Sequence, residues 1–190
     1  MAFRQSQTRC SGRPRRFPRR REGYRTLTDD HTVIGLTDGE RARAYPFTIL
    51  NVHEIVNDTF GEPVIVTYCP ICRSGMVAER RVGDEVTNFD VSGLLWKAPR
   101  IYSAASEQDG RVFSERDEGV ANNGNLVMYD AATGSYWSQM LATGICGEYS
   151  GERMTIAPAS ATTWAAWRDE HPDTEVLLPP PTSTTVDPPI

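Results

Sequence analysis

The stretch Val64-Ile-Val-Thr-Tyr-Cys-Pro-Ile-Cys72 decides the fold, because an apolar, β-branched run ends here in a Cys-x-x-Cys turn. Residues 64–66 lack the polar alternation of a half-exposed strand, so they predict a short strand buried on both faces. Pro70 lies between the two thiols and stiffens the loop that joins them. Such a strand would carry Cys69 and Cys72 to the edge of a hydrophobic core, a rigid place for a ligand or a reactive thiol.

Length and composition predict one domain with flanking segments. A chain of 190 residues is long enough to bury a core without disulfides, and its apolar fraction of 39% is slightly low for a compact globule. We therefore expect an Arg-rich arm over residues 1–25, a single globular domain over residues 26–178, and a Pro/Thr-rich tail over residues 179–190.

Charge is distributed unevenly along the chain. The first 25 residues contain nine Arg and one Glu, whereas the whole chain carries a net charge of −5, so the remainder is strongly acidic. A basic arm on an acidic body is compatible with an anionic partner such as nucleic acid, although many basic tails are only solvated.

The sequence predicts a soluble chain, because no run approaches the roughly 18 apolar residues that span a bilayer. Arg15-Arg16-Phe17 resembles the charged start of an export signal, but no apolar segment follows it. We therefore expect a cytoplasmic location, with export as the alternative.

Turn residues and periodicity predict the elements before and just after the central strand. Residues 32–45 are expected to form a hairpin around Asp38-Gly39. Apolar side chains at helical spacing then predict a helix over residues 46–58, with Pro46 in its first turn. Residues 75–81 and 86–92 are predicted to be strands joined near Gly83-Asp84.

The second half of the chain begins with a polar stretch over residues 97–125, which we interpret as a surface insertion. Strands are predicted over residues 126–130, 135–139 and 154–156. A helix is predicted over residues 160–170, capped by Ser160 and clamped onto a sheet by Trp164 and Trp167. The fold class is therefore α+β: β-rich, with mostly antiparallel strands and hairpins and two short helices.

Six short blocks follow one another in order along the chain: Arg43-Ala-Tyr-Pro46, His53-Glu-Ile-Val-Asn-Asp58, Thr67-Tyr-Cys-Pro-Ile-Cys72, Val91-Ser-Gly93, Leu126-Val-Met-Tyr-Asp130 and Ser135-Tyr-Trp-Ser-Gln139. Together they resemble the signature of a prokaryotic family called domain of unknown function 3179. The resemblance spans about residues 32–178 and implies no particular activity. It implies that relatives often carry an export signal or lipid anchor. The polar residues it assigns to the family pattern are His53, Glu54, Asn57, Asp58, Cys69 and Cys72.

A metal site is the first functional hypothesis. Two thiolates and an imidazole suit zinc or copper, so Cys69, Cys72 and His53 are the predicted ligands, with Cys146 as a possible fourth. Residues that would orient these ligands are Glu54, Asn57 and Asp58. The hypothesis assumes that the end of the predicted helix lies close to the Cys turn.

Three alternatives stay open, and so does the question whether the protein is an enzyme. Cys69 and Cys72 have the spacing for thiol–disulfide exchange, with Arg73 as a nearby cation. One of them could act as a nucleophile with His53 as base and Asn57 or Asp58 as orienting group. The pair could also be a structural disulfide, or two buried thiols, in a non-catalytic binding domain.

Overall fold

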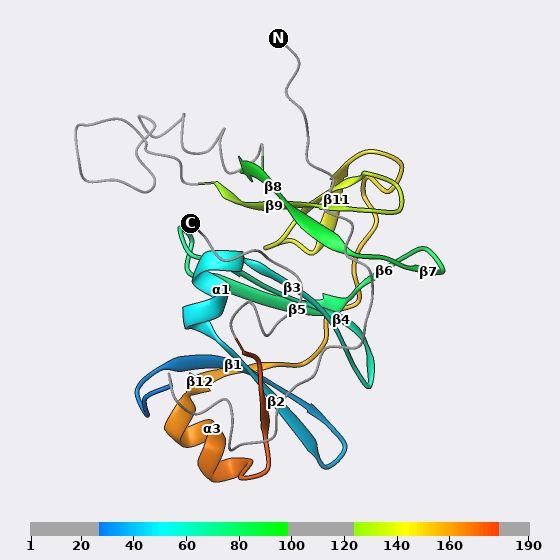
Figure 1. The fold of residues 1–190 in the computed structure, drawn as a ribbon. Coiled ribbons are helices and arrows are strands. Elements are labelled where there is room, and N and C mark those ends of the chain that lie inside the picture. The colour runs from blue at the N-terminus through cyan, green and yellow to red at the C-terminus, as the bar shows by residue number, and fades with distance from the viewer. Residues whose placement is uncertain (1–26, 99–123, 179–190) are drawn as a thin grey trace, which may run out of the picture.

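The computed structural model describes residues 27–98 and 124–178, which form three stacked β-sheets, a small two-stranded sheet and two helices (Figure 1). The predicted arm and tail and most of the predicted insertion lie outside the described residues. The lower sheet has the order β12 (Ser160–Thr163), β1 (Thr32–Asp38), β2 (Arg41–Pro46), β13 (Glu175–Val176). The middle sheet has the order β3 (Ile55–Phe60), β4 (Glu62–Cys69), β5 (Ser74–Glu79).

The upper sheet has the order β11 (Thr143–Cys146), β10 (Tyr136–Ser138), β9 (Asn125–Asp130), β8 (Phe89–Trp96). A small hairpin of β6 (Arg81–Val82) and β7 (Glu85–Val86) lies between β5 and β8 along the chain. Among the described strand pairs, only β13 with β2 is parallel. The prediction of a strand-rich, mostly antiparallel fold with two helices is confirmed, in an arrangement that resembles a β-sandwich.

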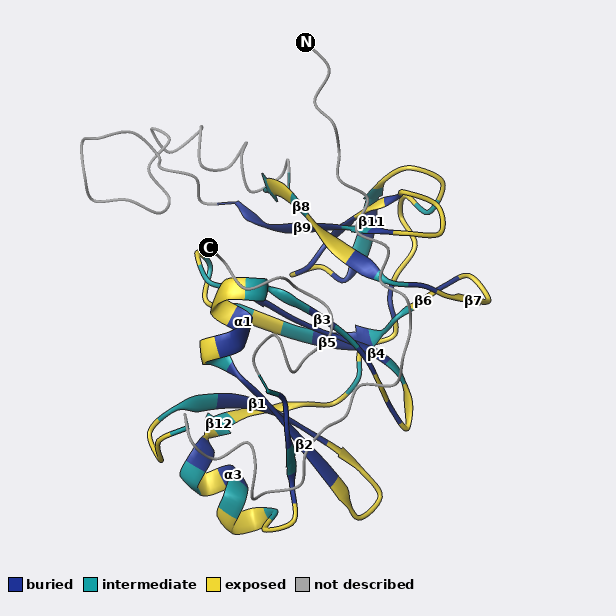
Figure 2. Cartoon of the chain, in the orientation of Figure 1, coloured by how far each residue is buried: buried dark blue, intermediate teal, exposed yellow. Residues whose placement is uncertain are grey.

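The central strand β4 is buried on both faces, as its sequence predicts (Figure 2). Val64, Val66 and Tyr68 face a core shared with the lower sheet and with α1 (Phe47–His53). Ile65 and Cys69 face a second core, shared with the upper sheet. Because successive side chains of a strand point to opposite faces, the unbroken apolar run supplies both cores at once.

The second helix, α3 (Trp164–Glu170), covers the outer face of the lower sheet. Trp164 and Trp167 are both buried there, which confirms their predicted clamping role. The ring of Trp167 lies where a Cβ atom of Gly35 would be, so a glycine in β1 allows the close approach. The cap differs from the prediction: the helix begins after Thr163, whose hydroxyl accepts a hydrogen bond from the Ala166 N–H at 3.3 Å, because residues 160–163 pair with β1 as a strand.

Several predicted turns are confirmed. Gly39 lies in the β1–β2 turn, Gly83 in the β6–β7 turn and Gly134 in the β9–β10 turn, each with a positive φ. The predicted pairing of residues 75–81 with residues 86–92 forms only at the short strands β6 and β7. The longer strands on either side pair elsewhere, β5 with β4 and β8 with β9. Residues 154–156 do not form the predicted strand, since this part of the chain makes only the isolated bridge of Ile156 with Ala78.

The predicted helix over residues 46–58 is wrong in its second half. The helix α1 ends at His53, Glu54 has a φ of 56°, and Ile55–Phe60 continues as β3. The six residues of β3 pair in register with β4, and β-branched Ile55 and Val56 favour that extended backbone. Tertiary pairing therefore overrides the helical spacing.

Both described helices have seven residues. Within the part of the chain that the structure describes, no helix has the length and apolar character of a membrane-spanning helix.

Candidate redox site at the Cys69–Cys72 turn

The Cys turn joins β4 to β5 in the middle sheet. Cys69 is the last residue of β4 and is buried, whereas Cys72 is partly exposed. Their Sγ atoms lie 2.8 Å apart, and the Cys72 N–H donates to Cys69 Sγ at 3.4 Å. Both cysteines are free thiols in the structure. The hairpin therefore holds two thiols within reach of each other on one short loop.

The Cys72 thiol lies at the boundary between the middle and upper sheets. It donates a hydrogen bond to the backbone carbonyl oxygen of Gly124 at 3.0 Å. Burial and the adjacent Cys69 raise the pKa of Cys72 to about 11, and the Asn125 side chain opposes this shift only partly. The site therefore stabilises the protonated thiol of Cys72.

A buried polar network lies directly behind the turn. Gln139, fully buried at 0% exposure, donates from Nε2 to the Ser74 carbonyl at 2.9 Å and to Thr67 Oγ1 at 3.2 Å. Asn125 donates from Nδ2 to Gln139 Oε1 and to Ser74 Oγ, both at 2.9 Å. Its own Oδ1 accepts from the Met140 N–H at 2.8 Å. The network links the β4–β5 hairpin to β9 and to the loop after β10.

His53 and Glu54 lie beside the strand that carries Cys69. The Glu54 carbonyl accepts a hydrogen bond from the Tyr68 N–H at 2.8 Å, so the end of α1 contacts β4 at the residue before Cys69. Burial lowers the pKa of His53 and raises the pKa of Glu54. Among the described residues, however, no hydrogen bond joins the His53 imidazole to either sulfur. The hypothesis of a Cys–His nucleophile therefore gains no support.

Asn57 joins two sheets and does not orient a ligand at the Cys turn. Its side-chain amide donates to the Phe89 carbonyl and accepts from the Phe89 N–H, each at 2.8 Å. The Asn57 side chain thus satisfies both backbone groups of Phe89, as a neighbouring strand would, and connects β3 of the middle sheet to β8 of the upper sheet.

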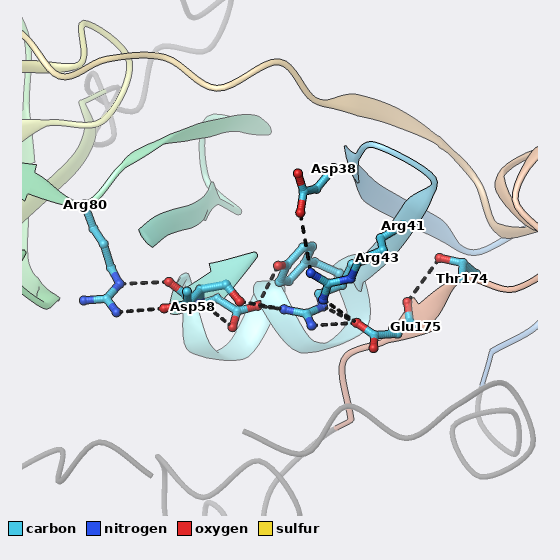
Figure 3. Close-up of polar contacts among 9 residues, drawn as sticks. Asp38, Arg41, Arg43, Asp58, Arg80, Thr174 and Glu175 are labelled. Carbon is cyan, nitrogen blue, oxygen red and sulfur yellow. Dashed lines mark hydrogen bonds and ion pairs between the residues drawn. The ribbon is translucent and has the colours of Figure 1, made fainter. Parts of the chain in front are cut away.

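Asp58 belongs to a separate buried ion cluster (Figure 3). Its Oδ2 accepts from Arg43 Nη1 at 2.8 Å and from the Tyr45 hydroxyl at 2.7 Å. Arg43 also donates to Glu175 Oε2, at 2.9 Å from Nε and 2.6 Å from Nη2. Burial and the Asp58 carboxylate raise the pKa of Tyr45 well above its ordinary value. Every one of these groups has partners within the cluster, which connects β2, β3 and β13.

Cys146 is exposed at the end of β11, on an outer strand of the upper sheet. Within residues 27–98 and 124–178, no group of three or more His, Cys, Asp or Glu side chains is placed to hold a metal ion. The structure thus brings Cys69 and Cys72 together, whereas Asn57 and Asp58 serve other contacts. Metal binding stays a prediction.

Sequence reasoning missed Ser74 and Asn125, which help to build the polar network behind the thiols. A usable signal was present for the network as a whole. Gln139 ends an otherwise ordinary strand pattern, and Asn125 directly precedes the apolar run Leu126–Tyr129. A side-chain amide at the end of an apolar strand is buried together with that strand, and a buried amide needs hydrogen-bond partners.

Comparison with known proteins identifies the family without adding an activity. No curated protein and no solved structure matches the chain. A family profile described as "Protein of unknown function (DUF3179)" matches residues 14–103 and 102–187. These two segments cover most of the chain, including the Cys turn and the polar network. The chain therefore belongs to the DUF3179 family of proteins of unknown function.

Proposed function

We propose that the protein is a thiol–disulfide redox protein whose Cys69 and Cys72 form a two-electron dithiol–disulfide couple. The observation that supports this best is the 2.8 Å separation of the two sulfurs on one tight hairpin turn. A disulfide between residues three apart closes a small ring, and here the hairpin already brings the two side chains together.

The reaction requires an external disulfide as electron acceptor. The Cys72 thiolate attacks one of its sulfurs, the external S–S bond breaks, and the first thiol leaves and takes up a proton. The Cys69 thiolate then attacks the Cys72 sulfur in the mixed disulfide, releasing the second thiol. Two protein thiols and one external disulfide thus become one protein disulfide and two external thiols. Cys72 reacts first because it is the more exposed of the two.

The raised pKa of Cys72 predicts the direction of the reaction. In Cys-x-x-Cys motifs with a low thiol pKa, the stabilised thiolate favours the reduced form and makes the disulfide an oxidant. A site that destabilises the thiolate has the opposite effect. Ser74, two residues after Cys72, begins a β-strand, so the turn is not followed by a helix N-terminus that would stabilise a thiolate. We therefore expect the couple to be a reductant, unlike the oxidising Cys-x-x-Cys couples that have a low thiol pKa.

The test is a redox titration of the full chain in dithiothreitol buffers, read by alkylation and mass spectrometry. The expected result is a reversible two-electron transition that Cys69→Ser and Cys72→Ser each abolish. Cys146→Ser is the matched control, because this thiol is free and remote from the turn along the chain, and it should leave the transition unchanged. A failure of Cys69 and Cys72 to join under oxidising buffer would refute the proposal. A disulfide that excess dithiothreitol reduces only in denaturant would indicate a structural role instead.

The same pair of sulfurs favours a second candidate, a soft metal ion bound by both thiolates. Zinc requires three or four protein ligands, whereas Cu(I) accepts fewer, so the described residues fit Cu(I) better than zinc. Outside the described residues, the sequence contains one further cysteine, Cys10, and no histidine. Elemental analysis after anaerobic loading with Cu(I) should give near-stoichiometric copper that Cys69→Ser removes, and loading with zinc should leave less metal bound. Metal-free protein after both loadings would exclude this candidate.

A further inference from the structure

A pocket of about 600 Å³ is lined by Tyr68, whose side chain points to the face of β4 opposite to that of Cys69. Its walls are largely apolar and include Ile34 of β1, Phe47 of α1 and Tyr68 of β4. The rings of Phe47 and Tyr68 lie 4.3 Å apart, so two aromatic side chains form one wall. A pocket of this volume matches the size of ordinary small-molecule sites.

The chain segment that leads to β12 completes the pocket. Residues 156–161 line it, and the Ala157 N–H donates to the Val77 carbonyl at 3.0 Å, which attaches the start of this segment to β5. Figure 1 shows the segment running from the upper sheet past the middle sheet to the lower sheet. Elements from the lower and middle sheets thus enclose the space.

Gly75 opens the floor of the pocket. It lies opposite Tyr68 in the β4–β5 pairing, where other strand positions carry a side chain. A Cβ atom at this position would lie 3.1 Å from Ile34 Cδ1 and 3.8 Å from Tyr68 Cδ2. A larger side chain here would therefore project toward the apolar wall, and the glycine leaves that volume to a ligand.

Arg73 is the charged residue among those that line the pocket. It is exposed and has a φ of 51°, an uncommon backbone conformation for a residue that carries a Cβ atom. Within residues 27–98 and 124–178, no carboxylate pairs with its guanidinium group, and none of the pocket's lining residues is acidic. A cation at the edge of an apolar pocket is complementary to an anion that carries an apolar body.

We propose that this pocket binds a small organic carboxylate with an aromatic or aliphatic body. The carboxylate accepts a paired hydrogen bond from Arg73, and the body lies against Ile34, Phe47 and Tyr68 over Gly75. The apolar wall of this site is separate from the thiol pair, because Tyr68 and Cys69 point to opposite faces of β4, and only Arg73 lies in the Cys turn itself. Carboxylate binding is therefore expected with or without a functional dithiol couple.

The test compares two probes with the same body, 1-naphthylacetate and 1-naphthylacetamide, by titration calorimetry on the full chain. The acetate should bind at least about tenfold more tightly, because only the acetate forms the charge-assisted pair with Arg73. Decanoate serves as an aliphatic probe in the same assay. If neither carboxylate binds at millimolar concentration, or if acetate and amide bind equally, the proposal is wrong.

Substitutions inside and outside the pocket test where the carboxylate binds. Arg73→Asn removes the charge while keeping a residue that tolerates a positive φ, and it should reduce acetate affinity to that of the amide. Gly75→Leu should abolish binding of both probes, with Gly75→Val as the replacement if the leucine variant does not fold. Arg153→Asn, which removes an exposed arginine outside the pocket, should leave affinity unchanged. Unaltered acetate binding in Arg73→Asn would overturn the proposal. The same measurements in a Cys69→Ser/Cys72→Ser protein should give the same affinities.

Discussion

The Cys72 thiol donates a hydrogen bond to the carbonyl oxygen of Gly124 over 3.0 Å, so the Cys turn of the middle sheet contacts the residue that precedes β9 of the upper sheet. Formation of a Cys69–Cys72 disulfide consumes the hydrogen of this bond. Oxidation of the pair would therefore break this contact between two sheets.

Thiol reactivity should depend on pH in a defined direction. Since the pKa of Cys72 is about 11, little thiolate exists at neutral pH in the reduced protein. We expect iodoacetamide to alkylate Cys72 slowly at pH 7.5 and faster at each higher pH up to about 11. The measurement is the alkylation rate of Cys72 by peptide mass spectrometry, with exposed Cys146 in the same sample as the internal control. A Cys72 rate that levels off near pH 9, the ordinary pKa of a cysteine thiol, would contradict the shift.

The same shift predicts a loss of stability at alkaline pH. Between the ordinary pKa of 9.0 and the folded value near 11, the folded protein keeps the Cys72 proton that the unfolded chain releases. Stability is therefore fully present below pH 9 and falls as the pH rises toward 11. Urea unfolding of the reduced protein at pH 8 and pH 10.5 should show a larger decrease for wild type than for Cys72→Ser. Equal decreases would mean that other groups account for the pH dependence.

Loss of the Gln139 amide should destabilise the fold. Gln139→Leu removes the donor for the Ser74 carbonyl and an acceptor of Asn125 within a buried network. Leaving such groups unpaired costs about 1–3 kcal/mol each, so we expect a total loss of roughly 2–4 kcal/mol. Chemical denaturation measures this loss as a decrease in the free energy of unfolding. The control is Asn51→Leu, which replaces an exposed amide on α1 and should change stability by less than about 0.5 kcal/mol.

The buried Arg43–Asp58 pair should be far more sensitive than a surface pair. Arg43→Met leaves the Asp58 carboxylate buried beside Tyr45, and removing one partner of a buried ion pair costs about 3–5 kcal/mol. Arg81→Met breaks an exposed pair with Glu62 and should cost at most about 1 kcal/mol. If denaturation curves of the two variants coincide, the buried cluster contributes less than its geometry implies.

Gly35 should tolerate no side chain. A Cβ atom there collides with the Trp167 ring, and overpacking of this kind typically costs about 1–3 kcal/mol. Gly35→Ala should therefore lower the melting temperature. Gly75→Ala is the matched strand control, since its nearest neighbour is the flexible end of Ile34. A melting temperature for Gly35→Ala equal to that of Gly75→Ala would show that α3 shifts at little cost.

Local sequence determined much of this protein. The unbroken run Val64–Val66 predicted a strand buried on both faces, glycine-containing pairs such as Asp38-Gly39 predicted the turns, and Trp164 and Trp167 predicted the clamp on the lower sheet. The Cys-x-x-Cys spacing likewise predicted two neighbouring thiols. These features depend on residues near each other in sequence, whose backbone preferences and side-chain periodicity act within one element.

Only the tertiary structure decided the roles of the polar residues. Residues 55–58 lie within the helix predicted over residues 46–58, yet residues 55–60 form β3, because pairing with β4 satisfies their backbone and buries Val56 and Phe60. That change carries Asp58 to Arg43 and Asn57 to Phe89, and neither partner is adjacent in sequence. Gln139 and Thr67, likewise, are 72 residues apart and meet behind the thiols. Such contacts arise from the stacking of three sheets, and a buried polar group takes whichever partner that stacking brings within hydrogen-bond distance.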